Sequence, residues 1–209
     1  MMKCFKMAIL CTGFMLGLSG FQAQAAPQQK EAIYLQNYNS ILRLMIKEMD
    51  AAEKTGDPSI DFLNEMIPHH EAAISMSENE LKYGGDRKVK KLADQIITDQ
   101  LKGVSQMKAM LKRLKANPTI DKEVEATYIR RYQSIAQEMF KRMKNVRATG
   151  NIDKDFLDGM IPHHEGAIEM AKNILQFTSD PELRKFAAGI IQNQGDQLQE
   201  MERMRVKLH

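Results

Sequence analysis

The chain has 209 residues, of which 43% are hydrophobic, 27% charged and 6% aromatic, and its formal net charge is +3. This hydrophobic content supports a packed core and excludes a disordered chain, and the small net charge argues against a nucleic-acid-binding protein. Methionine is abundant, because its 16 residues outnumber the eight phenylalanines and five tyrosines combined. Such an excess of thioethers is typical either of a flexible core or of a protein that binds a soft metal ion.

Residues 1–25 have the three parts of a secretory signal peptide. Lys3 and Lys6 supply positive charge, residues 7–18 form a short apolar stretch, and residues 23–25 carry the small-residue pattern of a cleavage site. The alternative is an uncleaved membrane anchor, for which the apolar stretch is short. Cleavage would remove both cysteines and leave a mature chain without disulfides and with 12 methionines. We therefore expect a periplasmic or secreted protein whose mature form does not span a membrane.

The rest of the chain is a tandem duplication. Residues 31–114 align without a gap on residues 125–208, at a constant offset of 94 positions and with 34 identities in 84 pairs. We therefore divide the mature chain into a first helical repeat, residues 26–118, and a second, residues 119–209. Two ungapped copies predict two structurally equivalent halves related by a pseudo-two-fold axis.

Each repeat is predicted to contain three helices. In the first repeat, hydrophobic periodicity and turn residues place them at about residues 29–54, 58–83 and 87–114. Gly56 suits the end of the first helix, and Asp57 with Pro58 suits the start of the second. No segment shows the two-residue alternation of a strand. The fold class is therefore all-α, a helical bundle of six long helices built from two three-helix units.

One motif stands out because it recurs unchanged inside the second helix of each repeat. The sequence Met-Ile-Pro-His-His-Glu occupies residues 66–71 and 160–165, and these two motifs hold four of the five histidines. The proline inside each motif cannot donate a backbone hydrogen bond, and we expect a kink just before the histidines. Two identical histidine doublets inside helices favour a metal-binding role over a structural one.

Helical spacing places methionine beside each doublet. Met66, His69 and Met76 lie on one stripe of the helix, and His70 flanks that stripe four residues after Met66. Adjacent histidines point about 100° apart, so both cannot face one spot squarely. We expect one histidine to bind the ion, while the other histidine or Glu71 orients it.

The methionines themselves give a second indication. All six methionines of the first repeat recur in the second, whereas only three of nine leucines and five of eight isoleucines do. A methionine that merely fills space exchanges with leucine at a cost usually below about 1.5 kcal/mol. The pairing therefore favours a role for sulfur. The six pairs are Met45/Met139, Met49/Met143, Met66/Met160, Met76/Met170, Met107/Met201 and Met110/Met204.

Thioether and imidazole ligands suit Cu(I), with Ag(I) as a mimic, and do not suit the oxygen-seeking ions of magnesium, calcium or manganese. A ferritin-like oxidase with a di-iron site is disfavoured, because the doublets contain no Glu-x-x-His motif and only Glu31, Asp61, Glu71 and Asp86 recur among the carboxylates. No zinc-protease motif or nucleophile stands out, so we expect no enzyme. The main alternative is a metal-free helical interaction protein with a methionine-rich core or groove.

The strings MIPHHEAAI and MIPHHEGAI, together with a following Ala-x-Ile-Ile-x-x-Gln helix, resemble the domain of unknown function 305 family of secreted bacterial proteins. The resemblance covers essentially the whole mature chain and implies a ferritin-like fold. Some members, of the CopM type, are periplasmic copper-binding proteins involved in copper tolerance, which implies that a copper transporter or chaperone is a partner. The copper ligands implied here are Met66, His69, His70, Met76, Met160, His163, His164 and Met170, completed by Met107, Met110, Met201 and Met204. The leading helix of each repeat is an addition to the family pattern and leaves open whether one bundle or two form.

Overall fold

The computed structural model describes residues 19–208, which form six α-helices joined by short loops. The helices are α1 (Ser19–Asp50), α2 (Pro58–Tyr83), α3 (Arg87–Ala116), α4 (Lys122–Lys144), α5 (Ile152–Ile174) and α6 (Pro181–Arg205). This part of the chain contains no strand, so the predicted all-α bundle of six long helices is confirmed. Residues 1–18, most of the predicted signal peptide, lie outside the described residues. Among the described helices, none has the length and hydropathy needed to span a bilayer.

The local boundaries follow the turn residues closely. Asp57 caps α2 by accepting a hydrogen bond from the backbone N–H of Ser59, and α2 has the predicted limits. The first helix ends at Asp50, earlier than predicted, and Gly56 lies in the loop beyond it with a left-handed φ of 88°. α2 continues as one helix through Pro68.

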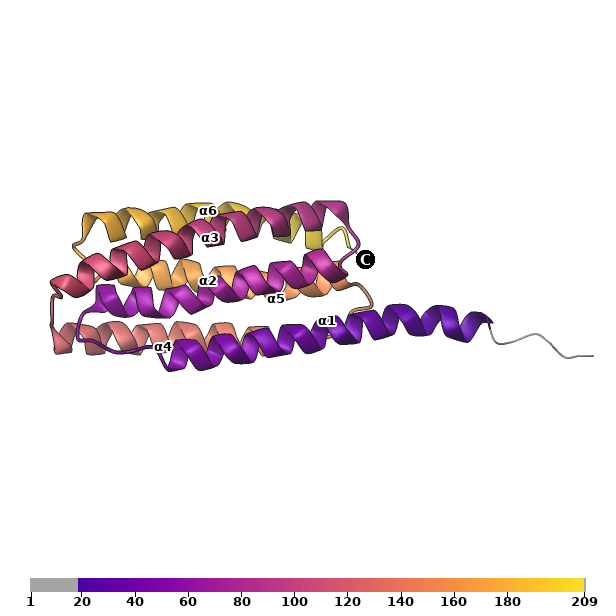
Figure 1. Cartoon of the computed structure of the whole chain (residues 1–209), viewed down its shortest axis with the longest axis horizontal. Helices are drawn as coiled ribbons and strands as arrows, with labels where there is room; N and C mark the ends of the chain where they lie inside the picture. The colour runs from indigo at the N-terminus through magenta and orange to yellow at the C-terminus, as the bar shows by residue number, and fades with distance from the viewer. Residues whose placement is uncertain (1–18, 209) are drawn as a thin grey trace, which may run out of the picture.

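The six helices form three layers of two, as Figure 1 shows. α1 and α4 make one outer layer, α2 and α5 lie in the middle, and α3 and α6 make the other outer layer. α2 packs against α1, α3 and α5, while α5 packs against α4, α6 and α2. The two repeats therefore form one joint bundle, whose central contact joins the helices that carry the two histidine doublets.

Reciprocal hydrogen bonds tie the repeats together. The carboxylate of Glu31 accepts a hydrogen bond of 2.7 Å from the backbone N–H of Gly150, and Glu125 accepts one of 2.5 Å from Gly56. Glu31 and Glu125 are equivalent positions of the two repeats, as are Gly56 and Gly150. Each repeat thus makes the same contact to the other, as a pseudo-two-fold arrangement requires.

The same glutamates also contact two buried aspartates. Burial, together with a hydrogen bond to Glu125, raises the pKa of Asp61 to about 6. Burial and the neighbouring Glu31 raise the pKa of Asp155 to about 7. Glu31 and Glu125 thus each lie beside a loop glycine and a buried aspartate of the other repeat.

One pair of positions breaks the symmetry between the repeats. On α2, Glu65 is buried and accepts a hydrogen bond of 2.7 Å from the hydroxyl of Tyr128. The equivalent position on α5 is Gly159, and the ring of Tyr38 packs against its backbone. The Tyr38 hydroxyl donates to the carbonyl of Met143 at 2.9 Å. The glycine is thus required by the close approach of a buried aromatic ring.

Replacing Gly159 with alanine is expected to destabilise the bundle. The added Cβ would lie 2.6 Å from Cε2 of Tyr38, which is 2% exposed and has little room to move. We expect the free energy of unfolding to fall by about 1–3 kcal/mol in urea titrations, because overpacking outweighs the helix propensity of alanine. Gly195→Ala is the matched control, since nothing lies within 4 Å of its added Cβ, and it should be neutral or stabilising. Equal effects of the two changes would contradict this account.

Candidate metal centre

The two histidine doublets meet at the contact between α2 and α5. His69, His70, His163 and His164 are 0%, 3%, 0% and 0% exposed, and we call them the histidine cluster. The ring centroids of His69 and His163 lie 3.7 Å apart, with an angle of 33° between the ring planes. Within each doublet the centroids are 6.0 Å apart. The sequence predicts two equivalent halves with one doublet each, and the structure brings the two doublets into one cluster.

Hydrogen bonds define the protonation of the second doublet. Nε2 of His163 lies 3.1 Å from the carbonyl oxygen of His69, and Nε2 of His164 lies 2.8 Å from Oε1 of Gln197. The amide orientation of Gln197 follows from its Nε2, which donates to Asp99 at 2.9 Å. Both histidine partners are acceptors, so each Nε2 carries the proton. Nδ1 of His163 and of His164 therefore carries a free lone pair.

This arrangement predicts the tautomers of the apo protein. We expect His163 and His164 to appear as neutral imidazoles with the proton on Nε2. Long-range ¹H–¹⁵N correlation spectra distinguish the two ring nitrogens by their chemical shifts. A proton on Nδ1 of either residue would contradict the hydrogen bonds described here.

Five buried ring nitrogens of the cluster have no hydrogen-bond partner in the described part of the chain: Nδ1 of His69, His70, His163 and His164, and Nε2 of His69. Burial lowers the pKa of His70 to about 3 and that of His164 to about 4, and holds the pKa values of His69 and His163 well below the usual range. The imidazoles are therefore neutral at physiological pH. Buried lone pairs without partners are costly in a folded protein and fit the ligand set of a metal ion.

The methionines implied as ligands lie on α2 and α5, which carry the cluster, and on α3 and α6, which pack against them. Seven of the eight are 0–1% exposed, and Met204 is partly buried against the core. They lie on α2, α3, α5 and α6 as Met66, Met76, Met107, Met110, Met160, Met170, Met201 and Met204. Met66 is on the face of α2 that carries the doublet, three and four residues before His69 and His70.

Carboxylates contribute little to this region. Glu71 lies at the surface in an ion pair of 3.0 Å with Lys108, and Glu165 pairs with Arg142, so neither orients a histidine. Among residues 19–208, no group of three or more His, Cys, Asp or Glu side chains converges as a metal site. A centre that uses the doublets therefore needs ligands beyond these four residue types, and thioethers are one such type.

The partner that does orient a histidine is Gln197, which sequence reasoning missed. Its equivalent in the first repeat is Gly103, and the partner of its amide, Asp99, is replaced by Asn193 in the second repeat. Because these residues differ between the repeats, a comparison of the two repeats does not identify them. Only the packing of α6 against α5 reveals them.

Two solved proteins are similar to this chain in structure. CopM, solved in apo, Ag-bound, Cu(I)-bound and Cu(II)-bound forms, is similar in structure. Its Cu(I)-bound form has a TM-score of 0.55 and 28% identity, over 72% of this chain and 97% of that one. A DUF305 fragment from Deinococcus radiodurans has a TM-score of 0.54 and 25% identity, over 72% of this chain and 97% of the fragment.

A curated relative, an uncharacterized protein of Acanthamoeba polyphaga mimivirus, is 47% identical over 49 residues, which are 23% of this chain. The match spans about a third of that relative, 32% of its length. The profile of one family matches residues 59–205, which is well over half of the chain. The chain belongs to this family, described as Domain of unknown function (DUF305).

Proposed function

We propose that this protein binds Cu(I) at the histidine cluster and its methionines, and that it sequesters, buffers or hands on the ion. The observation that carries the proposal is the set of five buried, unpartnered imidazole nitrogens in a methionine-rich core. Imidazole and thioether together are the ligand types that Cu(I) favours. The similarity to CopM, which was solved with Cu(I), Cu(II) and Ag, adds support for copper.

We assign one ion to each doublet, related by the pseudo-two-fold axis. The residues assigned are Met66, His69, His70, Met76, Met107 and Met110 for the first, and Met160, His163, His164, Met170, Met201 and Met204 for the second. The role is binding rather than catalysis. We place it in the periplasm or outside the cell, where it would contribute to copper tolerance and pass the ion to a transporter or chaperone.

Competition of the mature protein with a chromophoric Cu(I) chelator tests the proposal. We expect tight binding by the unchanged protein and its loss when all four clustered histidines become alanine. A Met→Leu variant at the eight assigned methionines should also lose the ion. The matched control carries the same change at Met45, Met49, Met139 and Met143 of α1 and α4 and should bind normally, because Met and Leu are similar in volume.

The main alternative is a metal-free interaction protein. The methionines lie inside the bundle, so an exposed methionine-rich groove is disfavoured, while a methionine-rich core is not. In the chelator competition, a copper-binding protein should take up Cu(I), whereas a metal-free interaction protein should not. Absence of Cu(I) binding by a folded protein, or unchanged binding by the four-histidine variant, would contradict the copper proposal.

A further inference from the structure

The two identical doublets have different surroundings on the side of α3 and α6. His164 is held by Gln197, whereas the equivalent position beside His70 is Gly103. A Cβ at Gly103 would lie 2.9 Å from Cδ2 and 3.2 Å from Nε2 of His70. The ring of His70 therefore lies directly against the backbone of α3 and has no side-chain cover at that position.

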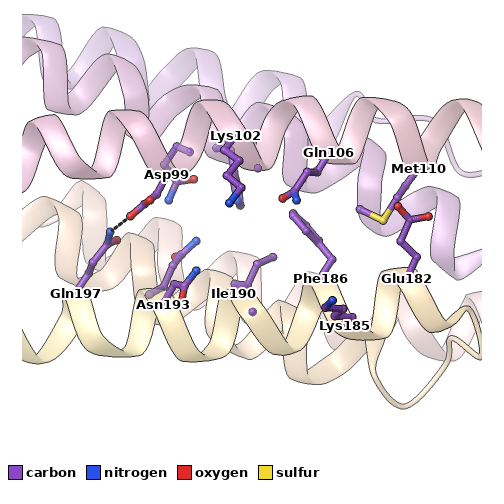
Figure 2. A pocket seen from close by; sticks show the side chains of 15 residues that line it. Asp99, Lys102, Gln106, Met110, Glu182, Lys185, Phe186, Ile190, Asn193 and Gln197 are labelled. Carbon is purple, nitrogen blue, oxygen red and sulfur yellow. Dashed lines mark hydrogen bonds between the residues drawn. The ribbon is translucent and has the colours of Figure 1, made fainter.

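A cleft of about 390 Å³ lies between α3 and α6, and His70 is the member of the histidine cluster that lines it. Figure 2 shows side chains of the two helices facing each other across it, with the Asp99–Gln197 hydrogen bond at one end. The cleft runs from exposed residues, such as Lys102 and Asn193, down to the buried His70.

The inner wall of the cleft offers soft and neutral ligands. The amides of Gln100 and Gln194, which are equivalent in the two repeats, are buried, and their Oε1 atoms have no hydrogen-bond partner. The thioether of Met110 also lines the cleft. Unpartnered buried oxygens favour a group that brings positive charge, such as a cation that has lost part of its water.

We infer that copper enters and leaves the histidine cluster through this cleft, with His70 as the histidine that exchanges the ion. This inference rests on the proposed function. His164 is the inner counterpart, because its hydrogen bond to Gln197 fixes its ring and its exposure is 0%. The doublets thus differ in kinetics, although their sequences are identical.

Two glycines of α6 provide a matched test in the full chain. A Cβ at Gly189 or Gly195 meets nothing within 4 Å, but only Gly189 is among the residues that line the cleft. Gly189→Leu adds a bulky side chain to the lining of the cleft. We expect it to slow Cu(I) transfer from a chromophoric chelator, followed by stopped flow, about tenfold at unchanged affinity, and Gly195→Leu to stay within about twofold. If Gly189→Leu binds Cu(I) normally and its transfer rate is unchanged, the entry route is wrong, while the proposed function stands.

Carbethoxylation of the apo protein by diethyl pyrocarbonate, read by peptide mass spectrometry, tests access without any metal. Among the four clustered histidines, we expect His70 to react first, and Gly189→Leu to slow it. Gln197→Gly, which copies the first repeat, should make His164 reactive as well. Equal reactivity of all four histidines would overturn the inference. Absence of copper binding in the transfer experiment would instead overturn the proposed function and the route with it.

Discussion

Saturation with Cu(I) is expected to raise the free energy of unfolding by about 4 kcal/mol when the free ion is about 1,000 times the dissociation constant. The physical reason is that the folded bundle holds the imidazole lone pairs and thioethers together, while the unfolded chain does not. The cluster is buried and its pKa values are low, so protons do not compete for the nitrogens at neutral pH. Urea unfolding under anaerobic, reducing conditions, with and without Cu(I), measures the gain.

The control for this prediction is the variant with all four clustered histidines changed to alanine, which should show no gain. The variant of α1 and α4 with leucine at Met45, Met49, Met139 and Met143 should keep the full gain. A stabilisation of the same size in the four-histidine variant would show that the ion binds elsewhere.

The second large effect concerns Glu80, which is expected to lower the free energy of unfolding at alkaline pH. Its side chain is buried, and burial together with the neighbouring Asp153 raises the pKa of Glu80 to about 9. A raised pKa means that the folded state holds the proton more tightly than the unfolded state. The stabilisation is complete below the unfolded pKa and is lost as the pH rises toward 9. We expect the wild type to lose about 2–3 kcal/mol of unfolding free energy between pH 7 and 9 from this group.

Glu80→Gln should abolish this loss, because the amide stays neutral and can still donate to Asp153. Denaturant unfolding at a series of pH values measures the difference. Other buried carboxyls do not obscure it, since the pKa values of Asp61, Glu65 and Asp155 reach only about 6, 7 and 7. Glu78→Gln on the exposed face of α2 is the matched control and should follow the wild type. Parallel curves for wild type and Glu80→Gln would contradict the prediction.

Much of the fold could be predicted because its signals are local. The limits of α2 follow from Asp57, Pro58 and the Gly84-Gly85 break, and the six-helix count follows from the duplication. The division of the chain at residues 118 and 119 and the signal peptide remain predictions. The first helix ended early because Gly56 serves the contact to Glu125 of the other repeat instead of a helix cap.

The candidate site was only partly predictable, because its geometry arises between the repeats. The sequence places methionine beside each doublet, but it does not show that the rings of His69 and His163 meet at the contact between α2 and α5. Nor does it show that Gln197 hydrogen-bonds to His164, while the ring of His70 lies against the backbone at Gly103. These differences depend on which helices pack together, and positions that differ between repeats carry no signal of shared function.

X-ray absorption at the copper K-edge of the Cu(I)-loaded protein tests the central claim most directly, since it identifies the atoms bound to the ion. Our account predicts sulfur and imidazole nitrogen together in the first coordination shell. The imidazole contribution should disappear in the four-histidine variant. A shell of oxygen and nitrogen without sulfur, or of sulfur without imidazole, would contradict the assignment of copper to the histidine cluster and its methionines.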